Sequence, residues 1–136
     1  MLMRLAAVFV GGLVGTALRW AADALLASPN DAFPYSTLLV NVIGSFVLAL
    51  LVGSVWVRPA VPDWLRAGLG AGVLGSFTTF SALASAVVVQ LASEQFALAA
   101  VHLAASLVLG LGAAFVGIRL GHHFGRGVEP SDWTTE

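Results

Sequence analysis

Long uncharged runs of apolar residues alternate with short polar linkers along the whole chain. Charged residues mark four such runs, which lie from Leu5 to about Leu26, between Asp31 and Arg58, between Arg66 and Glu94, and between Glu94 and Arg119. Each run is close to the ~20 residues that an α-helix needs to cross the hydrocarbon core of a bilayer. The pattern predicts an all-α membrane protein with four transmembrane helices.

The third run departs from a simple membrane helix at its centre. It carries no charge between Arg66 and Glu94, yet its middle reads Gly75-Ser76-Phe77-Thr78-Thr79-Phe80-Ser81. At bilayer depth, backbone departs from a helix only where protein or a water-filled cavity satisfies its polar groups. We expect the third helix to be broken at this segment, which is the strongest pointer to function in the chain.

Composition supports a membrane protein and excludes several other classes. The chain has 59% hydrophobic residues and only 10% charged residues, whereas soluble domains carry about 25% charged residues. A net charge of −1 leaves no basic stripe for nucleic acid. The absence of Cys removes disulfides, thiolate metal sites and Cys nucleophiles. No nucleophile–base set is present in the sequence, so we do not expect an enzyme.

We expect residues 1–120 to form one transmembrane domain and residues 121–136 to form a polar, disordered tail. The pair His122-His123 falls in this tail, where a solvated pair without a function is the better interpretation. A signal peptide is an alternative for the first run, because Arg4 precedes an apolar stretch. Arg19 and Asp23 interrupt the region where cleavage would occur, and three further spans follow.

The arginines predict an orientation. Five of them fall on the side of the termini and the second linker: Arg4, Arg58, Arg66, Arg119 and Arg126. The first and third linkers carry Asp31 and Glu94 instead. By the positive-inside rule this bias places both termini in the cytoplasm of a multi-pass plasma-membrane protein.

Small residues indicate close helix packing and an oligomer. Gly11 and Gly15 form a GxxxG pair in the first span, and such residues let membrane helices approach closely. Four helices this small enclose little interior, so a pore forms more easily between subunits. We therefore expect an oligomer within the bilayer.

Several polar side chains share helix faces inside the spans. Spacings of i, i+4 join Thr37 with Asn41, His102 with Ser106, and Ser81 with Ser85. Each hydroxyl can equally serve a hydrogen bond to the preceding turn or between helices. Asn41 can act as interhelical glue, and His102 as a packed neutral imidazole.

The last three spans contain no charged side chain, which argues against a cation-coupled carrier, because such carriers need an intramembrane carboxylate. Asp23 is the one candidate, close to a membrane face. A pathway here would be lined by hydroxyls, an amide, an imidazole and Phe ring edges, with Arg19 as the fixed positive charge. Donor groups and ring edges without carboxylates suit an anion.

Three motifs together resemble the small fluoride channel family known as Fluc or CrcB. They are Gly12-Leu13-Val14-Gly15-Thr16-Ala17-Leu18-Arg19, Thr37-Leu38-Leu39-Val40-Asn41-Val42-Ile43-Gly44-Ser45-Phe46, and the Gly75–Ser81 segment. The resemblance implies a fluoride-specific channel that exports cytoplasmic fluoride by passive permeation and so reduces its toxicity. It also implies an antiparallel dimer with two pores at the interface and a structural Na⁺ at the dimer centre.

The resemblance also implies roles for single residues. It places Asn41 in the pore as a fluoride hydrogen-bond donor, Phe80 as the first pore phenylalanine, and Ser106 as the pore serine of the fourth helix. It places Arg19 near the aqueous vestibule. The remaining candidates for the anion path are Ser81, Thr37 and His102. The backbone carbonyls of Gly75 and Thr78, from both subunits, would hold the Na⁺.

Three positions depart from the family pattern. Leu83 replaces the second phenylalanine, Ala82 replaces a hydroxyl residue, and His102 replaces a tyrosine. These changes, with the one-sided arginines, allow a second hypothesis, in which the chain is one half of a heterodimeric fluoride channel with a degraded pore. His102 is then a candidate to compensate for the missing ring.

Two rivals belong to other classes. One is a small multidrug or cation exporter, which relies on a carboxylate in the first span, although the position of Asp23 fits poorly. The other is a membrane scaffold without transport, in which the polar segment serves only as interhelical glue.

Overall fold

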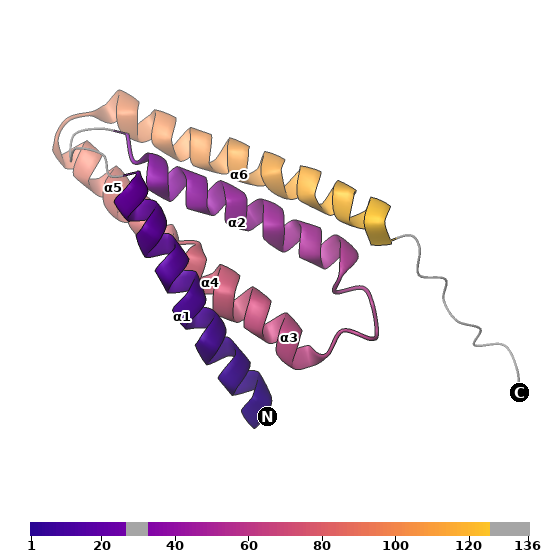
Figure 1. Ribbon diagram of the computed structural model, residues 1–136. Helices are drawn as coiled ribbons and strands as arrows, with labels where there is room; N and C mark the ends of the chain where they lie inside the picture. Colours follow the sequence, from indigo (N-terminus) through magenta and orange to yellow (C-terminus); the bar gives the residue numbers. More distant parts are fainter. Residues whose placement is uncertain (27–32, 126–136) are drawn as a thin grey trace, which may run out of the picture.

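A computed structural model describes residues 1–26 and 33–125, and this part of the chain is helical throughout its four spans (Figure 1). The elements are α1 Leu2–Leu25, α2 Tyr35–Ser54, α3 Asp63–Ala67, the π-helix η1 Gly68–Leu74, α4 Gly75–Phe77, α5 Phe80–Ala92 and α6 Phe96–Gly125. Within the described residues, four helical stretches are long and apolar enough to cross a membrane, the third being Asp63–Ala92. The predicted all-α membrane fold with a broken third helix is confirmed.

Helices α2 and α6 form one tightly packed pair, seen side by side in Figure 1. Glycines on α6 let the two backbones approach. A Cβ atom added at Gly121 would lie 2.7 Å from the carbonyl oxygen of Leu50 and 2.9 Å from the Cα of Gly53. Such contacts between small residues are how membrane helices associate closely.

Helix α1 packs against the first half of the third span, which comprises α3, η1 and α4. Glycines again mediate the approach, because Cβ atoms at Gly11 and Gly15 would overlap the carbonyls of Gly68 and Val73. The predicted GxxxG pair therefore packs against the backbone of η1. This segment is a π-helix, a wider winding that often occurs at functional sites.

The third span changes its packing partner where it breaks. Before the break, α3, η1 and α4 contact α1; after it, α5 contacts α6. Thr78 and Thr79 between them are extended, with ψ angles of 155° and 115°. Two residues of extended backbone thus let one span bridge the two helix pairs.

Few side chains are buried in the single chain. The buried hydrophobic residues of the described part are Val40, Leu74, Leu83 and Ala99. Large apolar side chains are instead exposed along every span, including Phe9, Leu18, Phe80 and Leu107. This distribution suits a protein whose spans contact lipid or another subunit.

Three arginines, Arg4, Arg58 and Arg66, lie at one end of the described molecule, where α1 begins and α6 ends. Arg4 forms an ion pair of 3.4 Å with Asp63, Arg66 donates to the carbonyl of Arg58 at 2.8 Å, and Arg58 donates to the carbonyl of Phe124 at 3.4 Å. The second linker therefore lies beside both the start of α1 and the end of α6. Within the described residues, the start of α1 and the end of α6 thus lie near the same end of the molecule.

Helix α6 continues past the residue at which the sequence predicts a tail. It ends at Gly125, so residues 121–125 are helical. The physical reason is contact with α2, because Gly121 and Gly125 both lie against the backbone around Gly53. The rest of the predicted tail, residues 126–136, lies outside the described residues, as does Asp31.

The packing of α1 on η1 generates a first prediction. Replacing Gly15→Ala places a methyl group where the carbonyl of Val73 lies, and overpacking of this kind costs about 1–3 kcal/mol. The thermal midpoint Tm of the purified protein in detergent should fall by several degrees. Gly112→Ala is the matched control, because a Cβ atom there meets nothing within 4 Å. An equal Tm for both variants would contradict this packing.

Candidate functional site

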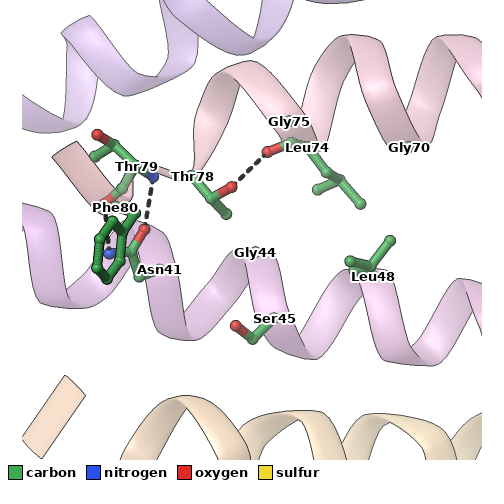
Figure 2. Close-up of a pocket in the computed structure, with 10 residues that line it drawn as sticks. All are labelled: Asn41, Gly44, Ser45, Leu48, Gly70, Leu74, Gly75, Thr78, Thr79 and Phe80. Carbon is green, nitrogen blue, oxygen red and sulfur yellow. Dashed lines mark hydrogen bonds between the residues drawn. The ribbon is translucent and has the colours of Figure 1, made fainter. Parts of the chain in front are cut away.

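The side chain of Asn41 is clamped onto the backbone of Thr79 by two hydrogen bonds. The Thr79 N–H donates to Asn41 Oδ1 at 2.8 Å, and Asn41 Nδ2 donates to the Thr79 carbonyl at 2.9 Å. Figure 2 shows both bonds crossing from α2 to the break. The amide of a residue on α2 thereby replaces the helical partners that the extended backbone at Thr79 has lost.

The threonine hydroxyls satisfy further backbone groups at the break. Thr78 Oγ1 donates to the Leu74 carbonyl at 2.9 Å. Thr79 Oγ1 accepts the Ala82 N–H at 3.1 Å, as an N-cap of α5, and lies 3.1 Å from Ser81 Oγ. A Thr side chain at an N-cap satisfies one of the donors that a helix start leaves open. Side chains of the predicted polar segment thus stabilise the break in the helix.

The break leaves carbonyl groups without their helical donors, among them those of Gly75 and Thr78. In a continuous helix the N–H of residue i+4 would donate to the carbonyl of residue i. The N–H of Thr79, four residues after Gly75, donates to Asn41 instead. The N–H of Ala82, four residues after Thr78, donates to Thr79 Oγ1. The carbonyls of Gly75 and Thr78 are therefore among those released by the break.

A hollow of about 320 Å³ opens between α2 and the broken third span. We call it the carbonyl hollow (Figure 2). It is lined by Asn41, Gly44, Ser45, Leu48, Gly70, Leu74, Gly75, Thr78, Thr79 and Phe80. Gly75 is exposed, and Phe80 is 79% exposed. This hollow therefore opens onto the surface of the single chain.

The released carbonyls fit a monovalent cation. Oxygen is the ligand atom that hard cations prefer, and unwound helices at membrane depth use freed carbonyls to coordinate Na⁺. Among the described residues no three His, Cys, Asp or Glu side chains gather as a metal site. Gly75 and Thr78, the two residues expected to hold Na⁺, thus line one hollow and carry the released carbonyls.

A second hollow, of about 420 Å³, lies among α1, α2 and α5. We call it the arginine hollow, and it is lined by Thr16, Arg19, Trp20, Asp23, Thr37, Thr79, Ser81, Ala82 and Ser85. Its lining is rich in hydroxyls, with one guanidinium and one carboxylate. Thr79 lines both hollows, so the clamped backbone of the break stands between them.

The predicted site residues fall into three groups. Arg19, Thr37 and Ser81 come together in the arginine hollow. Asn41, Phe80, Gly75 and Thr78 come together in the carbonyl hollow. His102 and Ser106 are not among the residues that line either hollow.

His102 and Ser106 are buried where α6 packs, consistent with the i, i+4 face that they share. His102 is 0% exposed, and its ring lies 5.1 Å from the Phe33 ring, edge to face. Its two ring nitrogens and Ser106 Oγ have no hydrogen-bond partner among the described residues. The sequence left open whether His102 is a packed neutral imidazole, and its burial in the single chain agrees with that interpretation. Their place in a pore stays a prediction.

Leu83 is also a packing residue. Its side chain is 6% exposed, and it lines neither hollow. Within this chain the leucine at this position therefore makes a buried contact. Ala82, the other departure beyond the polar segment, does line the arginine hollow, where it contributes no hydroxyl.

Sequence reasoning missed Thr79, which the structure places at the centre of the site. Its signal was available, since a Thr immediately before a helical run is a typical N-cap. Thr16 and Ser85 were also missed as lining residues of the arginine hollow. The spacing of Ser85 from Ser81 indicated a shared face, but the face of α5 that meets α1 and α2 depends on tertiary packing.

Comparison with known proteins agrees with this architecture. Residues 6–118 match the profile of the family described as CrcB-like protein, camphor resistance (CrcB). Several relatives carry the name fluoride-specific ion channel FluC, among them the following three. The protein of Novosphingobium aromaticivorans is 39% identical over 83% of this chain and 91% of its own length. The Thermus thermophilus protein is 40% identical over 84% of this chain and 91% of its own length. The Agrobacterium fabrum protein is 38% identical over 90% of this chain and 98% of its own length.

The relatives bear the name of an ion channel, which is in line with the expectation that the chain is not an enzyme. The match covers all four spans, including the broken third helix and both hollows. On these grounds the chain belongs to the CrcB-like family of membrane proteins.

Proposed function

We propose that this chain is a subunit of a fluoride-specific channel through which cytoplasmic fluoride leaves the cell down its gradient. The observation that carries the proposal is the arginine hollow, in which Arg19 and the hydroxyls of Thr37 and Ser81 line one space. The choice of fluoride as the permeating ion follows the name of the relatives. Passive permeation agrees with α2, α5 and α6, which hold no charged residue before Arg119.

Fluoride is small and strongly hydrated, so a pathway must replace its water with hydrogen-bond donors. Hydroxyl groups can donate to an anion and accept from a neighbour. An amide NH₂ has two N–H donors, and Thr79 takes one donor of Asn41. The second N–H remains for the anion, so Asn41 can clamp the break and donate to fluoride together. Phe80, at the mouth of the carbonyl hollow, offers a ring edge.

An antiparallel dimer with Na⁺ at its centre extends the proposal. Its support is the carbonyl hollow, because Gly75 and Phe80 are exposed there in the single chain. A second subunit would cover that surface and bring a second pair of carbonyls. Bound there, Na⁺ would supply positive charge to carbonyl groups that the break has released. The Gly75 and Thr78 carbonyls would be its ligands.

The termini are proposed to lie in the cytoplasm. Arg4, Arg58 and Arg66 gather at one end of the described chain, and positive residues favour the cytoplasmic side. The same bias favours one orientation, so the antiparallel partner is either a second copy inserted the other way or a homologue of opposite orientation.

Fluoride release from liposomes tests the function and the partner together. We expect liposomes that contain only this chain and Na⁺ to release fluoride within seconds to minutes and to retain chloride. Ion-selective electrodes measure both anions, and protein-free liposomes are the control. Release of neither anion, restored by adding a homologous chain, would exclude the homodimer and support the heterodimer. Equal release of both anions would contradict fluoride specificity.

Removing the positive charge of the arginine hollow should slow permeation. Arg19→Gln should lower the fluoride release rate by on the order of 10-fold at low ionic strength, because charged clefts raise the local concentration of counter-ions. The loss should shrink as salt is added, since salt screens the charge. Arg119→Gln is the matched control, because Arg119 lies over the Phe115 ring outside both hollows. Equal rates for the two variants at every salt concentration would remove Arg19 from the pathway.

A further inference from the structure

Asn41 is hydrogen-bonded to the backbone of Thr79, and a role in the pore would not by itself require these bonds. Its amide spans from α2 to residue 79, with one bond of 2.8 Å accepted and one of 2.9 Å donated. Both bonds are to the main chain of Thr79, which is itself buried. The pair fixes the position of the extended backbone rather than that of another side chain.

The accepted bond has a consequence at Gly75. If Asn41 Oδ1 did not take the Thr79 N–H, that N–H would be free to donate to the Gly75 carbonyl, as in an unbroken helix. A buried N–H without an acceptor is costly, so the helical bond is the available alternative. The Asn41 acceptor therefore decides whether the Gly75 carbonyl stays released.

The geometry fits a contact that is specific to this position. Gly44, one turn below Asn41 on α2, lies against the Thr78 side chain, since a Cβ atom there would overlap Thr78 Cγ2. Helix α2 thus approaches the break closely enough for a short amide to reach Thr79. Asn41, Gly75 and Thr78 line the same hollow (Figure 2).

We infer that Asn41 is the positioning residue of the cation site: by holding the Thr79 N–H it keeps the Gly75 carbonyl released for Na⁺, beside the Thr78 carbonyl that the Thr79 side chain releases by taking the Ala82 N–H. The inference rests on the proposed Na⁺ site. The inference makes the cation site depend on the same side chain that the proposed function assigns to fluoride, because Asn41 Oδ1 takes the Thr79 N–H while one N–H of its amide is left for the anion. Loss of Asn41 then removes Na⁺ binding in addition to any contact with fluoride.

Na⁺-dependent thermal stability separates the two roles. The full chain in detergent is melted in NaCl and in N-methylglucamine chloride at equal ionic strength. A bound ion stabilises the folded state, so the wild-type Tm should rise in Na⁺ by on the order of 5 °C. Asn41→Ala should lose this rise. Ser45→Ala, in the same hollow and on the same helix but without a bond to Thr79, should keep it.

Asn41→Asp tests the role of the acceptor atom Oδ1 by itself. It also keeps the inference testable if the Asn41→Ala variant does not fold. Its Oδ1 can still take the Thr79 N–H, so the Na⁺-dependent rise in Tm should remain while fluoride release falls at least 10-fold. A full Na⁺ response in Asn41→Ala, or its complete loss in a folded Asn41→Asp, overturns the inference. If the wild-type Tm is the same with and without Na⁺, both the cation site and the inference are overturned. Fluoride release by the wild type is measured separately and tests the channel.

Discussion

Backbone groups inside a bilayer must find hydrogen-bond partners within the protein, and the architecture of this chain depends on how that constraint is met at Thr78 and Thr79. A break there would otherwise expose several donors and acceptors at a depth without water. The Asn41 amide satisfies both backbone groups of Thr79, and the two threonine hydroxyls satisfy further groups on either side. Polar side chains that look costly in the sequence are therefore what makes the break tolerable.

The break in turn organises the molecule. It redirects the third span from α1 to α6, and so joins two helix pairs that otherwise touch little. It also creates two different environments on either side of Thr79. One presents released carbonyls and suits a cation, whereas the other presents the Arg19 guanidinium and several hydroxyls, beside the Asp23 carboxylate, and offers hydrogen-bond donors to an anion. The sites that we propose for Na⁺ and for fluoride would thus both border one irregular segment.

The sequence predicted the features that follow from local chemistry. Four apolar runs of membrane length gave four spans, and the Gly75–Ser81 segment located the break. Arg19, Thr37 and Ser81 were identified as candidates one at a time, and the structure brings them into one hollow.

The features that depend on tertiary contact were not predictable. The reach of Asn41 to Thr79 requires α2 to pass close to the break, and the burial of Leu83 and His102 depends on which faces α5 and α6 turn inward. The length of α6 was underestimated because Gly121 and Gly125 look like tail residues but pack against α2.

The most direct test is the backbone conformation of Thr78 and Thr79 in a lipid bilayer. Solid-state NMR of protein labelled with ¹³C at threonine gives Cα and Cβ shifts that distinguish extended from helical residues. Thr16 in α1 and Thr37 in α2 serve as internal helical references. Extended shifts at Thr78 and Thr79 are predicted. Helical shifts at both would mean an unbroken third span, and neither the released carbonyls nor the two hollows would then exist as described.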